Sequence, residues 1–210
     1  MIITFDGPAG SGKSTIAKAV AERLGFVHFN SGSIFRAITA FLLKNNKNLN
    51  SLKNANIKVE IKDNKQLVFI NDVDYTPILR NIEISKNVAL ISAIPEVQFA
   101  AQEIIKEFAT SHNIVIDGRG LGNEVLKNAE YKFYLDCSVK VRAKRRFLEE
   151  FSKGRKITVE EIEKQLELRD KLDREREIAP LAIPKNAIII DSTNLTIYEV
   201  AEKVLSFIKN

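Results

Sequence analysis

Near its amino end the chain carries the run Gly7-Pro8-Ala9-Gly10-Ser11-Gly12-Lys13-Ser14, directly after the apolar residues Ile2-Ile3-Thr4-Phe5. The spacing G-x-x-x-x-G-K-S between a strand and a helix is that of a P-loop, whose backbone N–H groups converge on phosphate oxygens. In such a loop Lys13 can reach the β- and γ-phosphates, and the hydroxyl of Ser14 can ligate Mg²⁺. An ordinary glycine-rich turn is the alternative, but it would not require Lys-Ser at the start of the helix. The run therefore predicts a nucleoside triphosphate site, without saying what happens to the triphosphate.

The length and composition of the chain suit one globular domain with insertions or a small satellite. Of its 210 residues, 45% are hydrophobic and 28% are charged, and no apolar run is long enough to span a bilayer. The single cysteine, Cys137, cannot form an internal disulfide or a cysteine-based metal site. Because the expected strand and P-loop begin at residue 2, we expect no signal peptide, a cytoplasmic location and no membrane partner.

The net charge of +5 raises the question of a nucleic-acid partner. The basic residues are concentrated between positions 140 and 176, where they alternate with acidic ones and with few aromatic residues that could stack on bases. A phosphate-handling site accounts for these arginines at least as well as a nucleic-acid groove does. We therefore expect no nucleic-acid partner, and a monomer is the plain expectation.

Apolar runs of strand length recur along the chain, with helical patterns between them. They predict an α/β fold of three layers, in which a central parallel sheet is covered by helices on both faces. The expected strands are Ile2–Phe5, Val27–Phe29, Ile114–Ile116, Lys132–Leu135 and Ala187–Ile190. Capping boxes at Thr158 and Thr196 predict the starts of two later helices, and Gly25 can end the first one.

A polar, asparagine-rich region between residues 44 and 80 interrupts this alternation. It contains two strand-like stretches, Ile57–Ile61 and Gln66–Ile70, joined by Lys62-Asp63-Asn64-Lys65, which predict a hairpin. The region is either a surface excursion or an inserted lobe for a second substrate.

Two polar clusters follow predicted strands and should lie at the carboxyl edge of the sheet, beside the P-loop. In the first, Ser31 offers a hydroxyl and Arg36 a bidentate phosphate clamp, although Ser31 or Ser33 could instead cap the next helix. In the second, Asp117 ends an apolar strand, as a carboxylate facing Mg²⁺ would, and Arg119 follows two residues later. A plain Asp-Gly turn is the alternative reading of the second cluster.

A third cluster lies in the sequence Arg169-Asp170-Lys171-Leu172-Asp173-Arg174-Glu175-Arg176. If this stretch is helical, Arg169, Asp173 and Arg176 share one face, with Pro180 ending the helix soon after. The alternative is a solvated face with one weak ion pair. Upstream, the basic stretch at residues 151–156 contains Gly154 and could be a lid that closes over a bound triphosphate.

The abundance of arginines indicates the class of acceptor. Phosphoryl transfer between a nucleoside triphosphate and a nucleoside monophosphate depends mostly on positioning and charge neutralisation. The acceptor phosphate is already ionised, so no general base is required, whereas a kinase for an alcohol would be expected to have one. Asp117 is the only obvious candidate for such a base.

The motifs taken together resemble those of the bacterial cytidylate kinase family, which phosphorylates CMP and dCMP. They are GPAGSGKST, NSGSIFRA, IDGRG, FYLDCSVKVRAKRR, LRDKLDRER-x-x-APL and IIDSTNLT. The resemblance covers nearly the whole chain and is weakest across residues 44–80. It implies the transfer of a phosphoryl group from ATP to CMP or dCMP with Mg²⁺. It also implies a core (about residues 1–43, 112–148 and 177–210), a monophosphate-binding insert (44–111) and a lid region (149–176).

The resemblance also assigns roles by position. Residues Gly7, Pro8, Ala9, Gly10, Ser11, Gly12, Lys13, Ser14 and Thr15 would hold ATP, with Arg142 and Arg146 near the lid and ATP. The monophosphate would be held by Ser31, Arg36, Arg80, Gln98, Arg119, Arg169 and Asp173, with Asp173 on the sugar hydroxyls. Arg176 would bridge the phosphates, so the expected catalytic residues are Lys13, Arg119, Arg169 and Arg176. Ser14 and Asp117 would hold the metal.

The chain departs from the family pattern at several of these positions. Asn30 stands where an aspartate is typical, and Phe35 stands in place of a tyrosine. Gly120 replaces the last aspartate of D-G-R-D. The serine and arginine that help to read cytosine fall at Ala89 and Gln98, when Pro95 anchors the alignment. Phosphate and sugar contacts are thus retained while the cytosine contacts are not, although the amide of Gln98 could still contact a pyrimidine edge.

Other functional classes remain to be weighed. Asp117-Gly118-Arg119-Gly120 satisfies the D-x-x-G pattern of a GTPase switch, but no N-K-x-D sequence follows to read guanine. A kinase with an altered acceptor base, such as UMP or another nucleoside monophosphate, is the main alternative. A nucleic-acid-binding module rests on net charge alone, and its binding would weaken steeply with salt.

Overall fold

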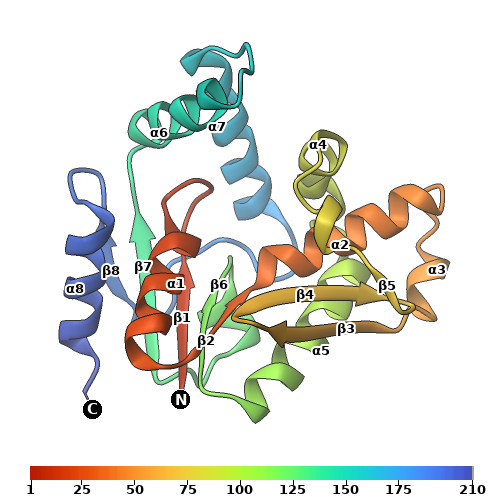
Figure 1. The fold of residues 1–210 in the computed structure, drawn as a ribbon, viewed down its shortest axis with the longest axis horizontal. Coiled ribbons are helices and arrows are strands. Elements are labelled where there is room, and N and C mark those ends of the chain that lie inside the picture. The colour runs from red at the N-terminus through yellow and green to blue at the C-terminus, as the bar shows by residue number, and fades with distance from the viewer. Residues whose placement is uncertain (210) are drawn as a thin grey trace.

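The central element of the fold is a five-stranded parallel sheet with the strand order β2-β6-β1-β7-β8. A computed structural model describes residues 1–209 of the protein (Figure 1). The strands are β1 (Ile2–Asp6), β2 (Val27–Asn30), β6 (Ile114–Asp117), β7 (Tyr131–Asp136) and β8 (Ile188–Asp191). Each lies within one residue of the boundaries predicted from the apolar runs, so the α/β prediction is confirmed.

Helices cover both faces of this sheet, as its two-sided apolar strands require. On one face, α1 (Lys13–Leu24) and α8 (Ile197–Phe207) pack over Ile3, Phe5 and Val115. On the other face, α2 (Ser31–Lys44) and α5 (Pro95–Ser111) enclose a larger apolar cluster with Ile114 and Ile116. Successive side chains of β6 therefore point to opposite faces of the sheet, and this one short strand contributes to both apolar clusters. Gly25, at φ 67°, ends α1, as predicted.

A small antiparallel sheet stands beside the main one and confirms the predicted hairpin. It contains β3 (Ile57–Lys62), β4 (Lys65–Ile70) and a short third strand, β5 (Val73–Asp74), that the sequence pattern did not predict. The turn residues Asp63 and Asn64 have φ values of 50° and 59°, the left-handed region that such turns require. Three short helices flank this sheet, namely α3 (Asn50–Lys53), the 3₁₀ helix η1 (Thr76–Ile78) and α4 (Ile82–Ile91). The α5 helix lies in the predicted insert by sequence but packs in the apolar cluster of the main sheet.

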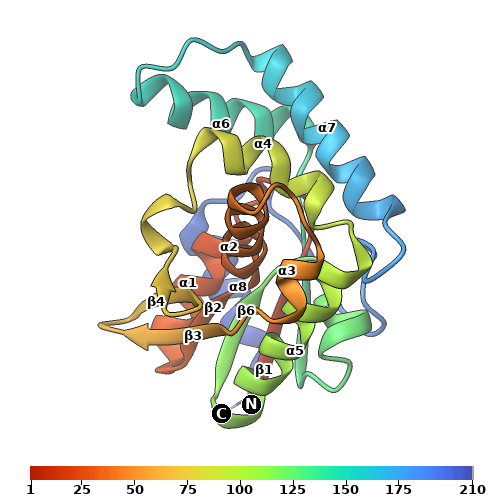
Figure 2. The ribbon, with the colours of Figure 1, turned by 90° about the vertical axis from the view of Figure 1, so that its right-hand side faces the viewer.

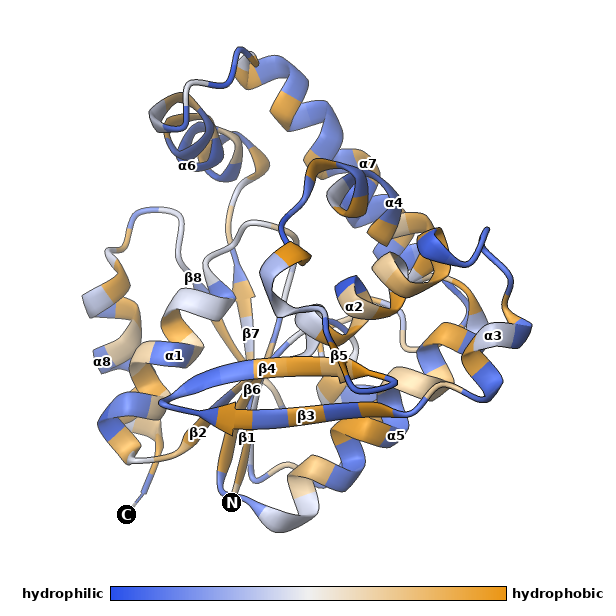
Figure 3. Ribbon diagram, turned by 45° about the vertical axis from the view of Figure 1, so that its right-hand side comes forward, coloured by the Kyte–Doolittle hydropathy of each residue, from blue (hydrophilic) through white to orange (hydrophobic). Residues whose placement is uncertain are grey.

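Two helices joined by residues 153–158 project above the carboxyl edge of the sheet. They are α6 (Val139–Ser152) and α7 (Val159–Glu175), and Figure 2 shows them crossing above the rest of the molecule. Much of their surface is polar, unlike that of the central strands (Figure 3). The predicted capping boxes are confirmed, at Thr158 for α7 and at Thr196 for α8. A π-helical turn, η2 (Leu121–Val125), follows β6.

One alternative reading and one local prediction were wrong. The cap of α2 is neither Ser31 nor Ser33, because the side chain of Asn30 accepts the N–H of Ser33. Arg176 does not lie on the face of α7, because the helix ends at Glu175 and Arg176 is extended. The chain turns back there, so that the N–H of Leu181 reaches the carbonyl of Asp173 at 2.6 Å.

Within residues 1–209, no single helix is long and apolar enough to cross a membrane. The pair α4 and α5 passes the same test of length and composition only when the two are taken together, across a bend of 100°.

Candidate active site

The P-loop connects β1, in the middle of the sheet, to α1. Gly7 begins the loop at φ 147°, and a Cβ there would lie 2.2 Å from the carbonyl oxygen of Leu135 on β7. Only glycine fits this close approach of two backbones. Lys13 folds back over the loop, and its Nζ donates to the carbonyl of Pro8 at 2.6 Å and to Ser11 Oγ at 3.3 Å. Burial, followed by the positive charge of Arg119, lowers the pKa of Lys13 to about 7. An anion bound in the loop would favour its charged form.

The two residues predicted to hold a metal lie together at the sheet edge. Ser14 Oγ donates to Asp117 Oδ2 at 2.5 Å, and Asn30 Nδ2 donates to Ser14 Oγ at 3.0 Å. His28 Nε2 contacts the other carboxylate oxygen of Asp117 at 2.8 Å. The strand register explains the grouping, because Asn30 and Asp117 are paired neighbours on β2 and β6. His28 was not singled out from the sequence. It lies two residues before Asn30 on β2, so the alternation of side chains along the strand puts both on the same face.

Ser31 is buried beside the same strand end. Its Oγ donates to the backbone carbonyl of Asp117 at 2.8 Å. A Cβ on Gly118 would lie 2.3 Å from this hydroxyl, so the glycine allows the close approach. Ser31 thereby joins the start of α2 to the end of β6.

Three predicted arginines converge on one buried carboxylate. Asp173 Oδ2 lies 2.7 Å from Arg119 Nε and 2.9 Å from Arg169 Nε, and Asp173 Oδ1 lies 3.5 Å from Arg176 Nη1. Burial alone would raise the pKa of Asp173, but the guanidinium groups of Arg119 and Arg169 outweigh it and hold that pKa below its ordinary value. Three cations around one anion leave an excess of positive charge.

More positive charge lies beside this group. Arg36 Nη1 donates to the carbonyl of Leu79 at 3.1 Å and to Ser85 Oγ at 3.0 Å. Burial, then the nearby charges of Arg169, Arg146, Arg80 and Arg119, lower the pKa of Arg36 to about 10. Arg80 and Arg146 are exposed, and within residues 1–209 the guanidinium group of neither makes a hydrogen bond or ion pair. We call Arg36, Arg80, Arg119, Arg146 and Arg169 the arginine cluster. Such an excess of charge suits a polyanion.

A carboxylate absent from the sequence reading supports the segment that carries Arg119. Asp6 ends β1, and both of its carboxylate oxygens accept backbone N–H groups, from Leu121 and Gly122, at 2.9 Å each. Burial raises the pKa of Asp6, although these two hydrogen bonds oppose the shift. A polar residue directly after a buried strand was the available signal in the sequence.

Comparison with known proteins agrees with this geometry. The family model described as cytidylate kinase matches residues 3–210. The chain belongs to the cytidylate kinase family. A cytidylate kinase from Listeria welshimeri is 42% identical over 211 residues, covering 97% of this chain and 94% of that protein. One from Caldicellulosiruptor bescii is 40% identical over 210 residues, covering 97% and 93%. Among solved structures, an uncharacterized protein from Eubacterium ventriosum shares the fold, with a TM-score of 0.55, 12% identity, and coverage of 99% and 97%.

In this member of the cytidylate kinase family, the three positions expected to read the base are 98, 120 and 89. Gln98 is buried at the start of α5, and its Nε2 donates to the carbonyl of Ser92 at 2.5 Å. Gly120 has φ 72°, and a Cβ there would lie 2.3 Å from the carbonyl oxygen of Ala179. Position 120 therefore has no room for a side chain unless the backbone moves. Ala89 is half-buried on α4.

Of the remaining predicted residues, Thr15 is exposed at the start of α1, and Arg142 is turned away from solvent. Arg142 is 5% exposed, and its guanidinium binds Asp170 and the carbonyls of Ala9 and Cys137. The structure thus brings Arg142 to the P-loop backbone rather than to an open site.

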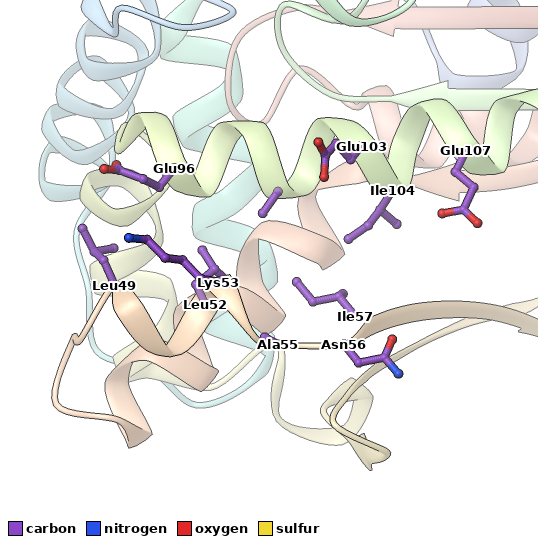
Figure 4. Close-up of a pocket in the computed structure, with 11 residues that line it drawn as sticks. Leu49, Leu52, Lys53, Ala55, Asn56, Ile57, Glu96, Glu103, Ile104 and Glu107 are labelled. Carbon is purple, nitrogen blue, oxygen red and sulfur yellow. The ribbon is translucent and has the colours of Figure 1, made fainter.

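A cavity of about 390 Å³ lies away from these residues, between α3, the start of β3 and α5 (Figure 4). Three carboxylates of α5, from Glu96, Glu103 and Glu107, lie along it, with Lys53 as the one basic lining residue. None of the predicted site residues lines it. Its charge is unsuited to phosphate, so it does not compete with the arginine cluster as a nucleotide site.

Proposed function

We propose that the protein transfers the γ-phosphoryl group of ATP to CMP or dCMP, forming ADP and CDP or dCDP, with Mg²⁺. The observation that carries this proposal is the arginine cluster, whose Arg119 lies close enough to Lys13 of the P-loop to lower its pKa, in a chain of the cytidylate kinase family. A P-loop accounts for one nucleotide, and the separate excess of positive charge accounts for a second phosphate-bearing one.

In this proposal residues 7–15 hold the phosphates of ATP, with Lys13 at the β- and γ-phosphates and Arg146 near the lid. Arg36, Arg80, Arg119 and Arg169 bind the acceptor phosphate, beside Ser31. Asp173 orients Arg119 and Arg169 and accepts from the sugar hydroxyls, and Arg176 neutralises charge between the two nucleotides. The acceptor oxygen is already ionised, so the residues position and neutralise, and no general base is needed.

The residues at the carboxyl edge fit Mg²⁺. The Ser14 hydroxyl and the Asp117 carboxylate are oxygen donors 2.5 Å apart, and Mg²⁺ is usually held by one or two carboxylates, waters and substrate phosphates. Ser14 and Asp117 would hold the ion, with Asn30 and His28 orienting them. When bound, the ion neutralises phosphate charge. We also propose that the protein acts as a monomer, because residues of one chain already bring together the P-loop, Asp117 and the arginine cluster, and that it acts in the cytoplasm.

A kinase with an altered acceptor base is the second candidate, and a specific observation favours it. Two of the three expected base-reading positions, Ala89 and Gly120, offer no polar side chain, and the amide of the third, Gln98, already donates to Ser92. UMP or another nucleoside monophosphate could then be accepted through the same phosphate and sugar contacts.

An acceptor screen tests both candidates. With saturating ATP and Mg²⁺, ADP formation is followed for CMP, dCMP, UMP, AMP and GMP, and kcat/KM is compared. We expect CMP and dCMP to be preferred. Lys13→Ala should lower kcat/KM about 10²-fold or more, because it removes a donor to the transferred phosphoryl group. The control Lys18→Ala alters an exposed lysine of the same helix and should retain activity. A far higher kcat/KM for another acceptor would replace the cytidylate assignment.

A further inference from the structure

One residue of the P-loop is held on both sides of its backbone by a single buried ion pair. The N–H of Ala9 donates to Asp170 Oδ1 at 2.9 Å, and the carbonyl of Ala9 accepts from Arg142 Nη1 at 2.7 Å. The two side chains pair with each other, with Arg142 Nη2 lying 2.8 Å from Asp170 Oδ2. Arg142 comes from α6 and Asp170 from α7, the two helices that project above the sheet edge (Figures 1 and 2).

The geometry leaves the guanidinium of Arg142 little freedom to contact a nucleotide. Its third nitrogen, Nε, donates to the carbonyl of Cys137 at 2.9 Å, so every nitrogen of the group has a protein partner. Arg142 and Asp170 are 5% and 2% exposed. Because its nitrogens are all bound within the protein, Arg142 can affect a ligand only through the P-loop backbone that it holds.

Apolar packing strengthens the same junction. Ala9 belongs to a small buried cluster with Ala143 of α6 and with Ile162 and Leu166 of α7. By contrast, Leu148 and Phe151, farther along α6, are exposed. The same cluster includes Phe147, Ile157 and Val159, so apolar packing joins Ala9 of the P-loop to both helices of the pair.

The charges of Arg142 and Asp170 matter because both side chains lie against the P-loop, where phosphate would bind. An isolated carboxylate against a phosphate-binding loop would repel the triphosphate, and a buried carboxylate without a partner is itself unfavourable. Pairing with Arg142 removes this repulsion and keeps Asp170 available as an acceptor for Ala9. The backbone of the loop is thus preset by a neutral pair instead of by a single charge.

We propose that Arg142 and Asp170 are positioning residues that set the P-loop for the donor nucleotide and join it to the base of α6 and α7. This inference rests on the proposed binding of ATP at the P-loop. It assigns Arg142 an indirect role in place of direct contact with ATP, and it gives Asp170 a role in the reaction.

A double-mutant cycle tests the inference, using Arg142→Met, Asp170→Asn and the double variant. Affinity for ATP is measured by calorimetry, and KM is measured separately for ATP and CMP. Arg142→Met leaves Asp170 unpaired, so we expect at least tenfold weaker ATP binding with KM for CMP changed less than twofold. The double variant removes the unpaired carboxylate and should recover at least threefold of the lost affinity.

Two outcomes would overturn the inference. If Arg142 contacts ATP directly, the double variant binds ATP as weakly as Arg142→Met does. If the pair serves stability alone, Tm falls while ATP affinity at low temperature stays at the wild-type value. Arg145→Met is the matched control, because that guanidinium on the same helix binds carbonyls at residues 192, 193 and 195, and the ratio of the two KM values should not change.

The design also covers a variant that does not fold. Asp170→Asn keeps an oxygen acceptor for Ala9 and loses only the ion pair, so it carries the test alone if Arg142→Met cannot be purified. Several-fold weaker ATP binding with unchanged KM for CMP is expected, and unchanged or tighter ATP binding would refute the inference. A wild-type protein that does not bind ATP would refute the proposed function instead.

Discussion

At the residue scale, Asp173 illustrates what sequence spacing can and cannot predict. The four-residue separation from Arg169 places both on one face of a helix, and this pair forms as expected. Arg176 also reaches Asp173, but from an extended segment after the helix. Arg119 approaches from the end of β6, more than fifty residues earlier in the sequence. Spacing identifies the local pair, whereas the convergence of all three cations depends on tertiary structure.

Replacing Asp173 should have a pH-dependent effect on stability. At pH 7, Asp173→Asn should lower the free energy of unfolding by about 3 kcal/mol, because one buried and two half-buried arginines lose their counter-ion. The pKa of Asp173 is lowered in the fold, so its stabilising effect is complete above the ordinary value of 3.8 and is lost as the pH falls through the lower folded value. The difference between wild type and variant should therefore shrink below about pH 4. Urea unfolding from pH 7 to pH 2.5 measures this difference.

The control for this experiment is Asp72→Asn, which alters an exposed aspartate paired with Lys58 and should change stability by less than about 0.5 kcal/mol. A difference between wild type and Asp173→Asn that stays constant down to pH 2.5 would mean that the charge of Asp173 is not what stabilises the arginine group.

At the element scale, the strands could be predicted because each is a short apolar run followed by a polar or glycine residue. The elements that were missed lack such a pattern. β5 is only two residues long, and η2 begins because Asp6 binds its first two N–H groups. Similarly, α7 ends where Leu181 bonds back to Asp173, which local sequence does not specify.

A comparison of two glycines tests the packing of the segment after β6. Gly120 and Gly154 share φ 72°, but a Cβ on Gly120 would lie 2.3 Å from the carbonyl oxygen of Ala179, whereas Gly154 has nothing within 4 Å. Gly154→Ala should cost about 1 kcal/mol of stability for its backbone conformation alone. Gly120→Ala should cost about 2 kcal/mol more, because two backbone segments must separate. Denaturant unfolding of both variants gives the comparison, and equal losses would indicate that these segments separate without strain.

At the scale of the whole molecule, the sheet order brings together the ends of strands that are far apart in sequence. The sequence predicted that Ser14, Asp117, Arg36 and Arg119 gather at one edge, since carboxyl ends of parallel strands share an edge. It did not predict Asp170 or His28, because their contacts depend on how α7 and β2 are placed. Net charge alone also left a nucleic-acid partner open, whereas the fold gathers more guanidinium groups than carboxylates beside the P-loop.

This charge distribution predicts that small polyanions stabilise the protein. Burial and the neighbouring charges of Arg169, Arg146 and Arg80 lower the pKa of Arg36 to about 10, so it stays protonated at neutral pH but is repelled by its neighbours. Pyrophosphate at about 100 times its Kd should add roughly 2.7 kcal/mol of stability, because it binds the folded state alone. For a chain of this size, that amounts to an increase in Tm of about 5–10 °C.

The comparison is made by thermal unfolding in millimolar pyrophosphate and in sodium chloride of equal ionic strength, so that general screening is matched. Arg36→Ala should lose at least half of the increase, while Arg23→Ala, on the exposed face of α1, should keep it. An equal increase in chloride, or an undiminished one in Arg36→Ala, would show that the arginine cluster is not the anion site.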